Sequence, residues 1–252
     1  MKPSFLNHEK PLLTTMIQKH HMHEVIDTVE KTLAEGPDAF GLQTCKLLQE
    51  YRNVDTYKEI FSHMKGKPVY VTNYRHVTNE GVSDEILADG LIEIAQAGGT
   101  LCDVMGDMFD KHPDELTVNP VAIDNQKRLI EKLHENGAEV LMSSHLYRFV
   151  PAERVVEIAL AQQERGADIV KIVTGAQTDE EVAENLKIAS LLKNEIRVPY
   201  LFLSTGESKI LRRVGPRLGC CMYLCVYEHD ELSTKNQPVL KNLKAIIDNF
   251  ED

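Results

Sequence analysis

Short apolar runs alternate with longer amphipathic runs along almost the whole chain, and this alternation limits the fold more than any other feature. Each short run has the length of a buried strand, and each longer run has the apolar period of a helix. The eight short runs are PLLTTMIQ, DAFGLQT, PVYVTNYR, TLCDVMGD, EVLMSSHL, DIVKIVTG, YLFLSTG and CMYLCVY. The helical patterns that follow them cover His23 to Ala34, Tyr57 to Met64, Asp84 to Ala97, Ile123 to Asn136, Ala152 to Arg165, Asp179 to Lys193, Ser208 to Val214 and Leu240 to Phe250.

Eight strand–helix units in 252 residues predict a (β/α)8 TIM barrel. Gly36, Gly137 and Gly166 lie a few residues before predicted strands, where helix-to-strand turns favour glycine. A doubly wound open sheet shares the alternation, but no G-x-G-x-x-G follows the first strand. Because no linker-like stretch divides the chain, we expect a single domain over residues 1–252 with a short N-terminal lead-in.

Charge and cysteine content limit the partners of the protein. The formal net charge of -11 argues against nucleic acid or an anionic membrane surface as the main partner. The five cysteines are an odd number without CxxC spacing, which is typical of reduced thiols. No apolar stretch has the length of a signal peptide core or a membrane span. We expect a cytoplasmic protein that forms a homodimer and acts on a small molecule.

Two consecutive predicted strands each carry one ionisable residue near the end that faces the active-site loops of a barrel. These residues are His145 in VLMSSHL and Lys171 in DIVKIVTG. A lysine inside an apolar run is costly to bury in its charged form, so its amine loses a proton more easily than an exposed one. Because the neutral amine attacks carbonyl groups, the placement predicts a Schiff-base enzyme with His145 as acid and base.

Structural roles for both residues stay open at this stage. The Lys171 ammonium could pair with a carboxylate across the barrel, for which Asp168 and Asp107 are candidates. His145 could be a hydrogen-bonded core residue. Other polar residues expected at the carboxyl ends of the strands, where barrel enzymes carry their chemistry, are Arg75, Glu80, Asp107, Ser204, Ser233 and Gln237.

Several segments resemble type I 3-dehydroquinate dehydratase. VLMSSHLYRFVP is similar to the family's strand with its catalytic histidine, and GADIVKIVTGAQ is similar to the segment whose lysine forms the imine. ILRRVGPRLG is similar to the stretch with the substrate-carboxylate arginine, which falls on Arg212, with Leu211 in place of a serine. Ser233 and Gln237 keep the four-residue separation of the family's last substrate-binding pair.

The resemblance implies dehydration of 3-dehydroquinate to 3-dehydroshikimate, a reaction of the shikimate pathway, without metal or cofactor. Lys171 forms the iminium, and His145 removes the α-proton and then protonates the departing hydroxyl. Glu80 in TNEG is similar to the glutamate that orients the catalytic histidine, and Arg75 is similar to the arginine that precedes it.

The side that recognises the substrate hydroxyls departs from the family pattern. Gly41 and Gln43 stand where the family carries glutamate-x-arginine, which makes Gln43 the expected substrate contact. DVMGD lacks the acidic-x-glutamate order, although Asp107 could substitute, and Leu146 replaces the usual aspartate after the histidine. Each unpaired buried group costs about 1–3 kcal/mol, so elimination from a different carboxylated β-hydroxy ketone stays open.

Three further alternatives fit part of the pattern. VKIVTG is similar to the lysine segment of deoxyribose-phosphate aldolase, but the glycine-rich phosphate turns after strands seven and eight are missing. His20, His21 and His23 with Asp107 could hold a metal in a hydrolase, if Lys171 were carbamylated. The altered hydroxyl side also fits a barrel that has lost activity and serves as a binding module.

Overall fold

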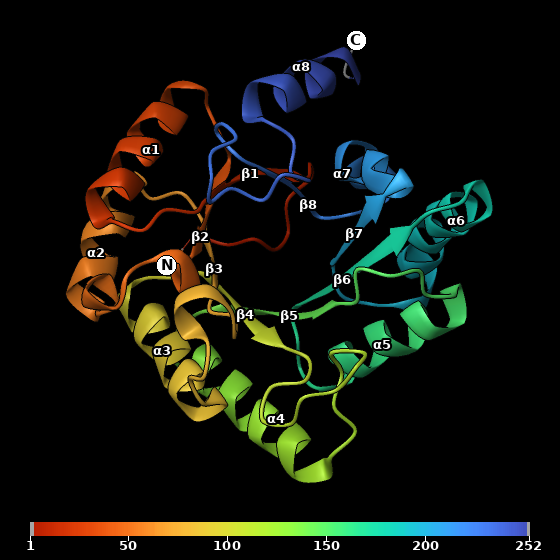
Figure 1. The fold of residues 1–252 in the computed structure, drawn as a ribbon, viewed down its shortest axis with the longest axis horizontal. Coiled ribbons are helices and arrows are strands. Elements are labelled where there is room, and N and C mark those ends of the chain that lie inside the picture. The colour runs from red at the N-terminus through yellow and green to blue at the C-terminus, as the bar shows by residue number, and fades with distance from the viewer. Residues whose placement is uncertain (1–2, 251–252) are drawn as a thin grey trace.

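The computed structural model describes residues 3–250, which form an eight-stranded parallel barrel surrounded by helices (Figure 1). The strands are β1 (Leu12–Ile17), β2 (Ala39–Gln43), β3 (Val69–Thr72), β4 (Leu101–Met105), β5 (Glu139–His145), β6 (Ile169–Ala176), β7 (Tyr200–Gly206) and β8 (Met222–Cys225). The helices are α1 (Met22–Ala34), α2 (Val54–His63), α3 (Asp84–Ala97), α4 (Pro120–Glu135), α5 (Ala152–Glu164), α6 (Asp179–Glu195), α7 (Leu211–Val214) and α8 (Leu240–Phe250). This arrangement confirms the (β/α)8 barrel expected from the alternation.

The strands follow one another around the barrel in chain order, and β8 pairs with β1. At the seam between β7 and β8, the amide of Cys221 donates to the carbonyl of Tyr200 at 2.9 Å. The predicted helix from Ser208 is short in the structure, because 3-10 turns at Glu207–Ile210 and Gly215–Leu218 flank α7. Because β7 and β8 stand at the two ends of the strand order with no ladder between them among residues 3–250, the barrel is nearly closed.

Two helices begin three residues earlier than the apolar period predicts, because asparagines cap them. The Asn53 side chain accepts from the amide of Thr56 at the start of α2. The Asn119 side chain accepts from the amide of Val121 at the start of α4, where proline takes the first helical position. Capping satisfies backbone donors that the first turn leaves free, so the polar first turns are helical as well.

The N-terminal lead-in covers the end of the barrel opposite the active-site loops. Phe5 is buried in the core, and its amide donates to Glu139, the first residue of β5, at 2.7 Å. The Ser4 hydroxyl also bonds to this carboxylate. Since these contacts close the amino ends of the strands, the open end of the barrel is the carboxyl end.

One buried arginine on the outer side of the barrel fixes the long loop between β4 and α4. Arg165, which follows α5, donates to the carbonyls of Gly106 at 2.8 Å and Thr117 at 2.6 Å. It also donates to the side chain of Gln126 on α4 at 2.9 Å. These bonds hold both ends of the loop, residues 106–119, against the scaffold.

Within residues 3–250, no helix combines the length and apolarity that crossing a membrane requires.

Gly206, the last residue of β7, lies tightly against the carboxyl end of β6. Gly206 has φ 65° and ψ -135°, and a Cβ there would lie 2.2 Å from the carbonyl oxygen of Ala176 on β6. Gly66 has a similar φ of 73°, but a Cβ there would meet nothing within 4 Å. We expect Gly66→Ala to cost about 1 kcal/mol of unfolding free energy, and Gly206→Ala at least about 2 kcal/mol more. Chemical denaturation measures both, and equal losses would contradict the collision.

Candidate active site

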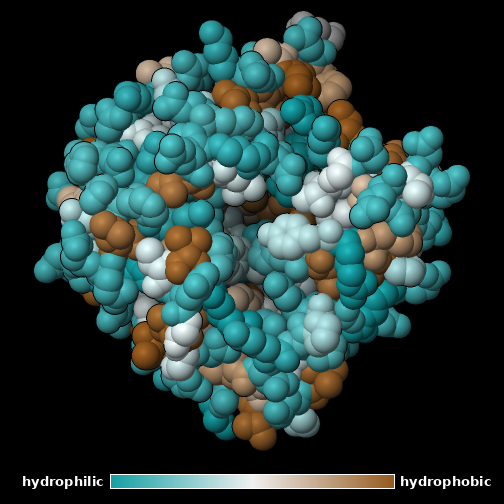
Figure 2. Space-filling model, in the orientation of Figure 1, coloured by the Kyte–Doolittle hydropathy of each residue, from teal (hydrophilic) through white to brown (hydrophobic). Residues whose placement is uncertain are grey.

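A cavity of about 770 Å³ opens at the carboxyl end of the barrel, a size typical of small-molecule sites. Figure 2 shows a hollow at the centre of the molecule, in the same orientation as the barrel of Figure 1. Residues from most of the strands and from the loops after them line it. Among them are His145 and Lys171, which the sequence predicts as catalytic.

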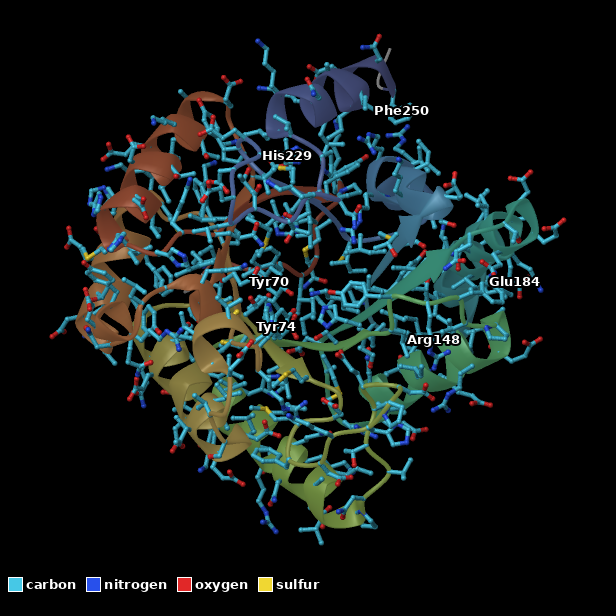
Figure 3. The ribbon with its side chains drawn as sticks, viewed as in Figure 1. Tyr70, Tyr74, Arg148, Glu184, His229 and Phe250 are labelled. Atoms are coloured by element: carbon cyan, nitrogen blue, oxygen red, sulfur yellow. The ribbon has the colours of Figure 1, made fainter. Side chains whose placement is uncertain are left out.

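Lys171 extends from β6 into a cluster of polar side chains inside the barrel. Its Nζ lies 2.8 Å from the Oη atoms of both Tyr70 and Tyr74, and 3.2 Å from Oδ2 of Asp103 on β4. Both phenols donate to the same Oδ2, and the Ser143 hydroxyl donates to Oδ1 at 2.5 Å. In Figure 3 the two labelled tyrosines lie near the centre of the barrel. The amine therefore sits in an ion pair with a fully satisfied carboxylate.

Burial and charge act in opposite directions on this cluster. Burial lowers the pKa of Lys171 below its ordinary value of 10.5, although the Asp103 charge opposes this shift. Burial alone would raise the pKa of Asp103, but the positive charge of Lys171 holds it below 3.8. Burial and the Asp103 charge raise the pKa of Tyr70 and Tyr74 well above 10. The carboxylate is thus anionic and the phenols are neutral proton donors at ordinary pH.

The carboxylate that meets Lys171 differs from both sequence candidates. Asp168 accepts from the amide of Val140 and contacts His134, and Asp107 accepts from Arg75. Asp103 takes the place because it points inward from β4. The sequence signal was available, since Asp103 interrupts an apolar strand as Lys171 does, and Tyr70 lies in the apolar run of β3.

His145 ends β5, and a carboxylate from the β4–α4 loop holds its ring. Glu115 Oε2 accepts from the His145 amide at 2.6 Å and lies 3.1 Å from Nδ1. Because a carboxylate only accepts hydrogen bonds, Nδ1 carries a proton and Nε2 is left as the free position. Burial alone would raise the pKa of Glu115, but the bonds and charge of His145 keep it below 4.5.

Glu115 makes the contact with His145 that the family resemblance implied for Glu80. Glu80 is exposed in the loop after β3, and the carboxylate that contacts His145 is Glu115. The chain brings Glu115 there because Arg165 clamps both ends of its loop, and the residue itself has a φ of 43°. No periodic pattern marks a loop residue of this kind, so Glu115 could not be found from the sequence.

Arg212 lies on the cavity wall as a buried cation. It is 5% exposed, and its Nε donates to the carbonyl of Ser204 at 3.0 Å. No acidic residue within residues 3–250 forms an ion pair with it. Burial lowers the pKa of Arg212 to about 10. A guanidinium buried without a counterion is suited to bind an anionic group of a ligand.

Neutral polar groups line the opposite side of the cavity. Gln43 on β2 accepts from Gln18 at 2.6 Å, and its Nε2 lies 3.1 Å from the ring of His76. Thr72 pairs in register with Gln43, and the sequence analysis did not select it. The side-chain oxygens of Thr72 and Gln237 are buried without a hydrogen-bond partner among residues 3–250. Because buried polar atoms are nearly always paired, these two oxygens mark an unsatisfied part of the cavity wall.

Two other expected substrate contacts are engaged elsewhere. Ser233 donates to the carbonyl of Asp230 at 3.0 Å and closes a turn in the β8–α8 loop. From this loop, Thr234 and Gln237 line the cavity. Arg75 lines the cavity, but its guanidinium is bound by the carboxylates of Asp84 and Asp107.

The histidines proposed for a metal hydrolase do not converge. His20 contacts the carbonyl of Lys46 at 2.7 Å, whereas His21 caps α1 and stacks on His23. In the part of the chain from residue 3 to 250, no group of three or more His, Cys, Asp or Glu residues is placed to hold a metal ion.

Fold and site together define a class: (β/α)8 barrels that carry a buried lysine amine in the cavity at the carboxyl ends of their strands. Residues 15–249 match the family of type I 3-dehydroquinase. The chain belongs to this family.

Individual relatives agree with this assignment. A 3-dehydroquinate dehydratase of Aromatoleum aromaticum is 23% identical over 250 residues, which cover 95% of this chain and 90% of the relative. One of Alkaliphilus oremlandii is 29% identical over 92 residues, so the match spans only 36% of each chain. The crystal structure of 3-dehydroquinate dehydratase from Geobacillus kaustophilus has a TM-score of 0.81 at 14% identity, covering 96% of this chain and 92% of the other. This structural similarity concerns the fold.

The two candidate glutamates provide a matched pair of variants. Glu115→Gln removes the charge that receives the His145 Nδ1 proton, so we expect the ring to lose its single tautomer. Glu80→Gln should leave the ring unchanged, because Glu80 is exposed and apart from it. Nitrogen chemical shifts of the His145 ring report the tautomer, and a change in Glu80→Gln alone would reverse the assignment.

The Lys171–Asp103 pair makes amine reactivity depend on pH. Because the neutral amine reacts, attack on 2,4-pentanedione should accelerate with rising pH until the pH passes the pKa of Lys171, which lies below 10.5. Asp103→Asn removes the charge that raises this pKa, so the rise should move to lower pH. Enaminone absorbance at a series of pH values measures the shift, and a move to higher pH would contradict the pairing.

Proposed function

We propose that this protein is a Schiff-base lyase that dehydrates 3-dehydroquinate to 3-dehydroshikimate. The observation that carries the proposal is the common cavity of Lys171, His145 and Arg212. The three side chains supply an amine nucleophile, an oriented imidazole and an anion-binding cation. Membership of the family and the match to a 3-dehydroquinate dehydratase over 95% of the chain support it.

Each step of the proposed reaction has a candidate group in the cavity. The Lys171 amine forms an iminium with the substrate ketone, and the iminium accepts the electron pair of the adjacent C–H bond. His145 takes the α-proton on Nε2, since Glu115 holds Nδ1. The enamine then expels the β-hydroxyl, which leaves as water with the proton from His145. Hydrolysis of the conjugated iminium releases the enone and restores the amine.

Recognition of the substrate is divided between the two sides of the cavity. Arg212 binds the substrate carboxylate, which supplies the counterion that the buried guanidinium lacks. Thr72, Gln43 and Gln237 bind the ring hydroxyls. Arg75 and Ser233 act indirectly, through the loop carboxylates and the loop turn that they hold.

One observation favours a second candidate, elimination from another carboxylated β-hydroxy ketone. Met16 takes the space above Gly41, where a Cβ would lie 2.1 Å from its sulfur. Leu203 and Leu224 extend this apolar surface along the cavity. A substrate with fewer hydroxyls would pack there without leaving polar groups unpaired.

The homodimer and the cytoplasmic location stay predictions.

Borohydride trapping combined with an assay on 3-dehydroquinate tests the proposal. In the wild-type protein we expect enone formation and a mass increase after reduction. Lys171→Met should lose both, whereas Lys187→Met on the exposed face of α6 should lose neither. His145→Ala should keep the mass increase but lower kcat about 10²–10⁴-fold, the usual range for lost acid and base catalysis.

The outcomes separate the candidates. Trapping of other carboxylated β-hydroxy ketones, with no turnover of 3-dehydroquinate at millimolar concentration, would select the second candidate. A mass increase that survives in Lys171→Met would overturn the Schiff base at this position.

A further inference from the structure

We propose that Tyr74 is a catalytic residue, whose phenol carries protons between the Lys171 amine, Asp103 and the substrate oxygen while the imine forms and hydrolyses. The inference deepens the proposed function and rests on Lys171 as the imine-forming amine. Under this proposal, proton transfer follows two separate paths. Tyr74 serves imine formation, and His145 serves the α-carbon.

The contacts of Tyr74 join the amine to the carboxylate. Its Oη accepts from Lys171 Nζ at 2.8 Å and donates to Asp103 Oδ2 at 2.5 Å. A proton leaving the ammonium can therefore enter the phenol oxygen as the phenol proton passes to the carboxylate. The same path runs in reverse when a proton is needed on the cavity side.

His145 is poorly placed for proton transfer during imine formation. Within residues 3–250 no hydrogen bond joins it to Lys171, and the ring of Tyr74 packs against its ring at 5.0 Å in a T-shaped contact. Glu115 also occupies its Nδ1. Tyr74 thus contacts both the amine and the imidazole.

The second tyrosine makes nearly the same bonds but lies deeper. Tyr70 also accepts from Lys171 at 2.8 Å and donates to Asp103, but it is 0% exposed and lies within β3. Tyr74 follows the end of β3, is partly exposed, and has its backbone carbonyl held by Asn79 at 2.7 Å. A carbonyl compound that enters from the cavity meets Tyr74 first.

The steps balance from the ion pair onward. The ammonium of Lys171 passes one proton through Tyr74 to Asp103, which leaves a neutral amine and a carboxylic acid. The nitrogen lone pair forms the N–C bond while the carbonyl electrons move to oxygen, and Tyr74 takes a proton from nitrogen as it gives its own to that oxygen. The C–O bond of the carbinolamine then breaks, and the hydroxyl leaves as water with the Asp103 proton, relayed by Tyr74. The nitrogen lone pair closes the C=N bond, which yields the protonated iminium and the carboxylate.

The electrostatics of the cluster agree with this role. Burial and the neighbouring Asp103 charge raise the pKa of Tyr74 well above 10, so the phenol stays protonated through the pH range of the reaction. A protonated phenol can both donate and accept, which a relay requires.

Tyr74→Phe and Tyr70→Phe form the matched pair for the test, with 2,4-pentanedione as the probe. This diketone reacts with the neutral amine whether or not the protein dehydrates 3-dehydroquinate, so the relay can fail while the proposed function holds, and the reverse. We expect Tyr74→Phe to lower the rate of enaminone formation on the high-pH plateau about 10²-fold, the low end of acid–base catalysis. Tyr70→Phe should lower this rate less than Tyr74→Phe does, since it keeps the relay, and Tyr51→Phe, outside the cavity, should leave the rate unchanged. Lys171→Met gives the blank.

The plateau rate separates a relay from an effect on the pKa of the amine. A change in that pKa moves the midpoint of the pH profile, whereas loss of the relay lowers the plateau. Equal losses in both variants, or an unchanged plateau in Tyr74→Phe, would overturn the relay. A melting curve checks the fold of each variant.

The solvent deuterium isotope effect on the plateau rate of the wild-type protein is a second measurement. A normal effect supports the relay, and the lack of one contradicts it.

Discussion

The ion pair of Lys171 and Asp103 inside the barrel is the interaction on which the rest of the site depends. Moving two opposite charges out of water is costly. This cost is offset only when the remaining hydrogen-bond donors and acceptors of the pair find partners. Here Tyr70, Tyr74 and Ser143 supply those partners. Side chains from four neighbouring strands, β3 to β6, or from their ends, meet around the Lys171 amine. The barrel interior near the carboxyl ends of these strands is therefore polar.

One helix positions both the amine and the imidazole from outside the barrel. Gln162 on α5 accepts from the Lys171 amide at 3.1 Å and donates to its carbonyl at 3.3 Å. Arg165, directly after the same helix, clamps the loop that carries Glu115, and Glu115 orients His145. Packing of α5 against the barrel thus sets the placement of the Lys171 amine and of the His145 ring together.

The cavity joins a charged end to a neutral end. Arg212 lacks an acidic partner among the described residues, which suits an anionic ligand, whereas Thr72 and Gln237 offer single unpaired oxygens. Neutral groups discriminate hydroxyls by leaving a polar atom unpaired when the hydroxyl is missing. Met16 above Gly41 adds an apolar surface on the same side. The chain therefore combines the fold of its family with a cavity whose neutral side differs in chemistry from its charged side.

The sequence by itself determined the barrel and the placement of Lys171 and His145 at its cavity, because both follow from local patterns. Strand and helix periods repeat within a few residues, and a lysine or histidine near the end of an apolar strand is visible in the chain. Only the tertiary structure decided that Asp103 pairs with Lys171, that Tyr74 stands beside the amine, and that Glu115, unlike Glu80, reaches His145. Those contacts depend on the register between distant strands and on a loop held in place by Arg165. Long-range register and loop conformation arise from packing of the whole barrel, which no local period encodes.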